Sequence, residues 1–113
     1  MNWNLIHNEN GKYQFKNNDS KLSEEFFFAH RYYSGFAVVQ KEKNDLFQYR
    51  DSLGTLSEGF YEANNYNGNY ALVKKERNSQ WQIRDTHGNL YDKWITIDTP
   101  NYHGFEPITD NLK

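Results

Sequence analysis

Apolar and polar side chains alternate along several short stretches of this chain. FQYR (47–50) and WQIR (81–84) each place two large apolar side chains on one face of a strand and Gln and Arg on the other. GFAVV (35–39) and YALV (70–73) are apolar on both faces, which predicts strands that are covered on both sides. This alternation is typical of β-strands, and it does not fit helices.

Turn signals separate these stretches. DSLG (51–54) and DTHG (85–88) predict tight turns, because Asp accepts backbone N–H bonds at the first position and Gly supplies a positive φ at the fourth. Such signals recur about every ten residues, and two helices do not fit between them. The stretches are therefore expected to pair as antiparallel β-hairpins.

The chain repeats itself every 34 residues, which aligns units 13–46, 47–80 and 81–113 after a half unit, 2–12, and the third unit slips by one residue after Pro100. Identical pairs include Gln14/Gln48, Leu22/Leu56, Ser23/Ser57, Glu24/Glu58, Phe26/Phe60, Ala29/Ala63, Tyr32/Tyr66, Ala37/Ala71 and Val39/Val73. One hairpin buries too little surface to be stable, so the units are expected to cover each other. We predict an all-β fold of antiparallel β-hairpin repeats, stacked into a single domain.

The composition agrees with a sheet. Nine Tyr, eight Phe and three Trp supply most of the large apolar surface, and aromatic rings suit a pleated, half-buried face. The chain has no Cys, so it has no disulfide or thiolate metal ligand. A net charge of −2 gives no electrostatic reason to bind nucleic acid or an anionic membrane. Since no leader-like or membrane-spanning apolar run is present, we expect a soluble cytoplasmic protein.

The repeated phrase resembles the bacterial WG-repeat family. The matching positions are Gly35, Ala37, Val39, Phe47, Tyr49, Asp51 and Gly54, then Ala71, Val73, Trp81, Ile83, Asp85 and Gly88. The resemblance covers nearly the whole chain, and it implies a β-rich protein that mediates binding and has no catalytic residues to transfer. The copies are divergent: Gln14, Gln48 and Gln82 replace the motif Gly, and Asn17 and Ser20 replace the turn Asp and Gly of the first copy.

Residues able to perform catalysis are scattered. Nucleophile, phosphate-loop and zinc-protease motifs are absent. Asp51 and Asp85 are expected to make turns. The histidines lack metal-ligand spacing, and they are His7, His30, His87 and His103. We therefore expect no enzyme activity, no metal and no cofactor.

Stacking of equivalent residues predicts two charged rows. The basic row is Lys16, Arg50 and Arg84. The acidic row is Glu24, Glu58 and Asp92, with Glu25 adjacent. In one interpretation the basic row pairs with neighbouring acids and the acidic row is a solvated face. In the other, like charges are kept in register to meet a partner of opposite charge.

Tyrosines in the third part of each unit give a further candidate surface: Tyr32, Tyr33, Tyr66 and Tyr102. Tyr beside Arg or Asn is common at protein interfaces, and it also suits stacking on sugars or bases. In a second interpretation, Phe26, Phe60 and Trp94 point inward and the tyrosines only cap the core.

These observations favour a non-enzymatic module that binds another protein through the acidic row and the tyrosines. Its most specific form is a small intracellular inhibitor, an immunity or anti-defence protein that neutralises its partner. The alternative is binding of carbohydrate or single-stranded nucleic acid on an aromatic face, although the charge argues against nucleic acid. An enzyme would need distant carboxylates and His in one deep pocket, and a structural component would use open sheet edges.

Overall fold

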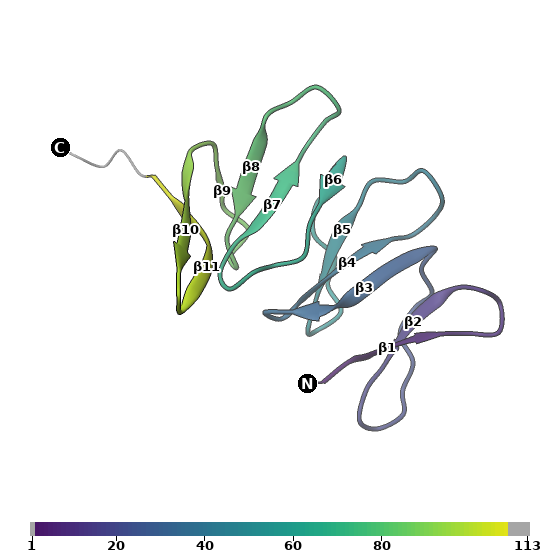
Figure 1. Cartoon of the computed structure of the whole chain (residues 1–113). Coiled ribbons are helices and arrows are strands. Elements are labelled where there is room, and N and C mark those ends of the chain that lie inside the picture. The colour runs from purple at the N-terminus through teal and green to yellow at the C-terminus, as the bar shows by residue number, and fades with distance from the viewer. Residues whose placement is uncertain (1, 109–113) are drawn as a thin grey trace.

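The computed structural model describes residues 2–108, and in that range it contains strands but no helix (Figure 1). Predicted unit 81–113 therefore extends beyond the described residues at 109–113. The strands are β1 (Asn4–His7), β2 (Tyr13–Lys16), β3 (Phe28–Tyr33), β4 (Phe36–Gln40), β5 (Gln48–Asp51), β6 (Glu62–Ala63), β7 (Ala71–Lys74), β8 (Trp81–Arg84), β9 (Leu90–Tyr91), β10 (Trp94–Thr99) and β11 (Tyr102–Pro107). Every strand pair in this range is antiparallel, which confirms the predicted fold class.

The described residues form four sheets that follow one another in chain order, in an elongated molecule of 54 × 33 × 24 Å (Figure 1). They are β1–β2, β3–β4–β5, β6–β7–β8–β9 and β10–β11. The second sheet begins in unit 13–46 and ends in unit 47–80. Each central sheet thus combines the tail of one sequence unit with the hairpin that leads into the next.

After each turn the chain returns along the strand that precedes the turn. Leu22 bridges Lys16, and Leu56 bridges Arg50 at the equivalent position of the next unit. Leu90 pairs with Arg84 within the strand pair β8–β9. This return brings the residues that follow each turn back beside the strand that precedes it.

The turns themselves have the predicted chemistry. At Asn17, Asp51 and Asp85 the side-chain Oδ1 accepts the N–H groups two and four residues on, at 2.8 to 3.0 Å. The fourth residue has a positive φ in every case, and this includes Ser20 at φ 65°. Asn and Ser therefore build the same turn in the first copy as Asp and Gly build in the others, because both Asn and Asp present an Oδ1 acceptor.

The core lies between sheets, and both faces of the second sheet contribute to it. Ala37 and Val39 of β4 belong to one buried cluster, while Val38 of the same strand belongs to the next. The prediction that GFAVV is covered on both sides is therefore confirmed. The first cluster in the chain contains Phe15, Phe26, Ala29, Ala37 and Val39, and the second contains Val38, Tyr49, Phe60, Tyr66, Ala71 and Val73.

Candidate functional site

Arg50, in the middle of the predicted basic row, lies inside the protein. Its side chain is 5% exposed. Nη2 and Nε donate to the Glu24 carboxylate at 3.2 and 3.3 Å, and Nη1 donates to the Tyr32 hydroxyl at 2.7 Å. The guanidinium also lies 4.6 Å from the ring centroid of Trp3, within cation–π range. We call these four residues the Arg50 cluster.

Arg84 has an equivalent environment one unit later. Nη1 donates to the Tyr66 hydroxyl at 2.8 Å, and Nη2 donates to Glu58 at 3.4 Å. The ring centroids of Tyr49 and Phe36 lie 5.3 and 5.9 Å from the guanidinium carbon. Its Nε is buried and has no hydrogen-bond partner among the described residues. These five residues form the Arg84 cluster.

The charged rows are thus mainly used inside the protein. Pairing of the basic row with acids is confirmed for Arg50 and Arg84, each with the acid 26 positions earlier, while Lys16 is exposed. Glu24 and Glu58, whose side chains are 44% and 47% exposed, therefore hold neighbouring sheets together. The other two predicted acids accept hydrogen bonds from side-chain amides. The Asp92 carboxylate accepts one from Gln82 at 2.7 Å, and the Glu25 carboxylate accepts one from Asn8 at 2.7 Å.

Two of the four candidate tyrosines are also internal. The Tyr32 hydroxyl donates to the carbonyl of Asp51 at 2.8 Å, and the Tyr66 hydroxyl donates to that of Asp85 at 2.6 Å. Burial raises the pKa of both hydroxyls, although each accepts a hydrogen bond from arginine that acts in the opposite direction. Both tyrosines fix the turn of the next unit. Tyr33 is 44% exposed, and Tyr102 is half-buried in a separate hollow described below.

The Gln that recurs at the repeat spacing has a structural use in the first two full units. Gln14 and Gln48 donate from Nε2 to the carbonyls of Ser23 and Ser57, at 2.8 and 2.7 Å. The hydroxyls of those serines accept the backbone N–H of the residue that follows each Gln. The Gln and Ser pair therefore ties the returning chain to its strand. The recurrence of both residues at the repeat spacing was the signal for this link.

One repeated surface feature was missed in the sequence. Phe27, Tyr61 and Ile95 occupy equivalent positions of successive units, and they are 43%, 40% and 47% exposed. Each follows an aromatic residue that was expected to point inward, so strand alternation could have predicted the exposure. We call these three residues the tip row.

The tip row lies on the side of the molecule where the central hairpins turn. Phe27 donates its backbone N–H to the carbonyl of Lys41, and Tyr61 donates to that of Lys75, both at 3.2 Å. Lys41 and Lys75 are exposed residues that directly follow β4 and β7. Figure 1 shows the start of β10, which carries Ile95, on the same side as the β4–β5 and β7–β8 connections.

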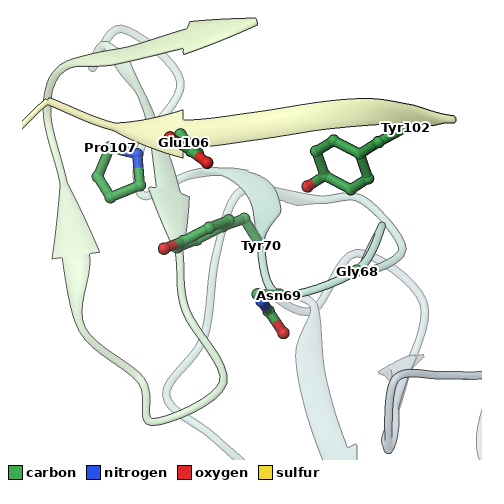
Figure 2. Close-up of a pocket in the computed structure, with 6 residues that line it drawn as sticks. All are labelled: Gly68, Asn69, Tyr70, Tyr102, Glu106 and Pro107. Atoms are coloured by element: carbon green, nitrogen blue, oxygen red, sulfur yellow. The ribbon is translucent and has the colours of Figure 1, made fainter. Parts of the chain in front are cut away.

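The hollow that contains Tyr102 lies between the third sheet and the last hairpin (Figure 2). Its described lining is Gly68, Asn69, Tyr70, Tyr102, Glu106 and Pro107. Tyr102 is the only residue of the predicted binding set in this lining. The structure therefore separates the predicted tyrosines into two internal supports, one exposed ring and one wall of a hollow.

Among residues 2–108, no group of three or more His, Cys, Asp or Glu is arranged to hold a metal ion. The one close His–carboxylate pair in that range, His103 with Asp98 at 2.6 Å, is largely solvent-exposed. The described residues include no helix that is long and apolar enough to cross a membrane. Comparison of the chain with models of known protein families, with characterised proteins and with solved structures gave no match.

Proposed function

We propose that this protein is a non-enzymatic binding protein that contacts a partner protein through the tip row. In its most specific form it is a small inhibitor of the immunity or anti-defence type, which neutralises its partner by covering a surface. The observation that carries this proposal is the exposure of an apolar side chain at the same position of successive units.

The surroundings of the tip row support a protein partner. Single exposed apolar side chains are common on protein surfaces, but repetition on one side of a stack gives an extended line of contacts. Charged residues border it on the hairpin connections, in KEKN (41–44) and KERN (75–78), and every residue of these two segments is exposed. Apolar contacts inside a polar rim are the usual anatomy of a protein interface.

We also propose that the chain is a divergent member of the WG-repeat family. The support is internal: the same turn and the same return of the chain recur in successive units. The Gln–Ser link is further support, since it gives the Gln at the motif Gly position the same use in the first two full units.

The test is affinity capture from the native host with the full chain and with a Phe27→Ser, Tyr61→Ser, Ile95→Ser variant. The wild type should recover a specific protein, and the triple variant should lose it. The purified partner should also lose its own activity when the wild-type chain is added. Circular dichroism checks that the variant keeps its sheet content.

Leu53→Ser is the matched control, because Leu53 is apolar and 84% exposed but lies in a turn outside the tip row. This variant should capture the partner as well as the wild type does. Equal capture by the triple variant would contradict the tip row as the contact surface. Capture of no protein by the wild type would contradict the function itself.

A further inference from the structure

The hollow beside the last hairpin has a specific chemical character. Figure 2 shows Tyr70 beneath β11, which carries Tyr102 and Glu106. Two phenol rings, the Asn69 amide and the Glu106 carboxylate therefore border one space, and none of its described lining residues is positively charged. Ring faces and a carboxylate both attract cations.

The Tyr102 ring lies over Gly104, and a neighbouring hydrogen bond fixes the hairpin that carries the ring. A Cβ at Gly104 would overlap this ring, and a Cβ at Gly68 would lie 3.5 Å from it. The Asn67 Nδ2 donates to the carbonyl of His103 at 2.6 Å, which ties the last hairpin to the turn before β7. The ring can lie along β11 because Gly104 has no side chain there.

The Tyr70 ring is positioned from the other side. It makes an edge contact with Tyr91, with centroids 6.4 Å apart, and the Tyr91 hydroxyl donates to the Asp85 carboxylate at 3.0 Å. Burial raises the pKa of Tyr70, and the negative charges of Asp85 and Glu106 raise it further. The same negative charges favour a bound cation.

The two arginine clusters of this protein show which cation aromatic rings and a carboxylate can bind. In both arginine clusters a guanidinium lies among aromatic rings, a tyrosine hydroxyl and a carboxylate. Tyr70 occupies the position that corresponds, one unit later, to Phe36 of the Arg84 cluster, so it offers the equivalent ring to the next space. Residues 85–113 contain no arginine.

We propose that this hollow binds the guanidinium of an arginine side chain presented by a partner protein. The planar cation lies between Tyr70 and Tyr102 and pairs with Glu106, as Arg50 and Arg84 do with their own rings and acids. The partner as the source of the arginine rests on the proposed function, but the chemistry of the hollow does not.

The test is a titration of the full chain with N-acetyl-arginine methylamide, followed by NMR of the Tyr70 and Tyr102 ring protons and the Gly68 and Gly104 amides. We expect saturable shifts with a dissociation constant on the order of 1 mM. N-acetyl-citrulline methylamide, which has a similar shape but no charge, should bind at least about ten-fold more weakly. Equal shifts with both compounds, or no saturable shift, would overturn the proposal.

Glu106→Gln should weaken binding of the arginine compound about ten-fold, since it removes the paired charge from an exposed position. Glu9→Gln is the matched control, because Glu9 is an exposed acid at the other end of the molecule, and the affinity of this variant should not change. Unchanged affinity in Glu106→Gln would also overturn the proposal. This titration needs no partner protein, so a negative result would not contradict the tip row as a contact surface. A negative capture experiment would likewise not contradict arginine binding in the hollow.

Discussion

The Arg50 and Arg84 clusters are two versions of one arrangement, and they differ in how completely the guanidinium is satisfied. Arg50 makes two bonds to Glu24 and one to Tyr32, and its cation faces Trp3. Arg84 makes one longer bond to its acid, and its Nε is buried without a partner among the described residues. A buried donor without a partner costs free energy, so the same residue type contributes unequally at equivalent positions.

The two clusters also differ in the ring that faces the cation, which for Arg50 is Trp3. It comes from the half unit before the first hairpin, and its indole N–H donates to the carbonyl of Ser52 at 2.9 Å. This bond joins the first sheet to the turn after β5, 49 residues later. The Arg84 cluster uses Phe36 and Tyr49, whose rings lie farther from the cation and belong to the adjacent sheet. The half unit therefore supplies to the first cluster a ring that lies closer to the cation.

Substitution of each arginine should give the largest losses of stability, and the two losses should show which cluster stabilises the fold more. Arg50→Met should lower the free energy of unfolding by about 3 kcal/mol, and Arg84→Met by about 2 kcal/mol, because the second substitution also removes an unsatisfied donor. Urea unfolding measures both. An equal or larger loss for Arg84→Met would contradict the ranking.

Trp3→Leu should lower the free energy of unfolding by about 2 kcal/mol, because it removes the ring over Arg50 and the indole bond to Ser52. In the Arg50→Met background the loss should be smaller, since part of the interaction is already absent. In the Arg84→Met background it should be unchanged. Equal losses in both backgrounds would show that Trp3 does not act through Arg50.

Neutralising the acids should have a smaller effect, since both carboxylates are partly solvated. Glu24→Gln should cost about 1 kcal/mol and Glu58→Gln about 0.5 kcal/mol, in line with the bonds that each makes. Raising the salt concentration to about 1 M should narrow the difference, because it screens exposed charges. Urea unfolding of both variants at low and high salt concentration tests this prediction. A larger difference between the two losses of stability at high salt would contradict it.

The smallest expected effect is a pH dependence near the Arg84 cluster. Burial acts to raise the pKa of Asp85, but hydrogen bonds from Asn89, Tyr91 and His87 outweigh it and lower the pKa. A lowered folded pKa means that the carboxylate stabilises the fold above its unfolded pKa of about 3.9, and that this stabilisation is lost as the pH falls through the folded value.

Asp85→Asn isolates this contribution, because Asn17 shows that an amide oxygen builds the same turn. The variant should lose less stability than the wild type when urea unfolding is repeated from neutral pH down to about pH 3. Identical pH profiles for the two proteins would exclude Asp85 as the source.

The sequence predicted the sheets well, because period-two alternation and turn residues are local signals. FQYR illustrates both the success and the limit. Tyr49 and Arg50 do face opposite ways, but both are buried, since Tyr49 packs in one inter-sheet core and Arg50 lies in the other. Alternation identifies two faces, whereas only the stacked structure shows that each face has its own protein neighbour.

The candidate surface was harder to predict for the same reason. The local sequence makes Tyr32 and Tyr66 plausible interface residues, but their hydroxyls bind arginines and carbonyls far away in the sequence. Phe27, Tyr61 and Ile95 gave only a weak local signal, since an apolar residue in an aromatic run is usually assigned to the core. Equivalent positions in a repeat should therefore be compared one face at a time.

The 26-residue reach of each arginine back to its acid has a consequence for synthesis of the protein. On the ribosome, the polar groups of Glu24 and Tyr32 stay hydrated until Arg50 leaves the exit tunnel. The polar groups of Glu58 and Tyr66 stay hydrated until Arg84 leaves it. Assembly should therefore advance from the N-terminus in steps of one sheet, each completed by the emergence of the next arginine.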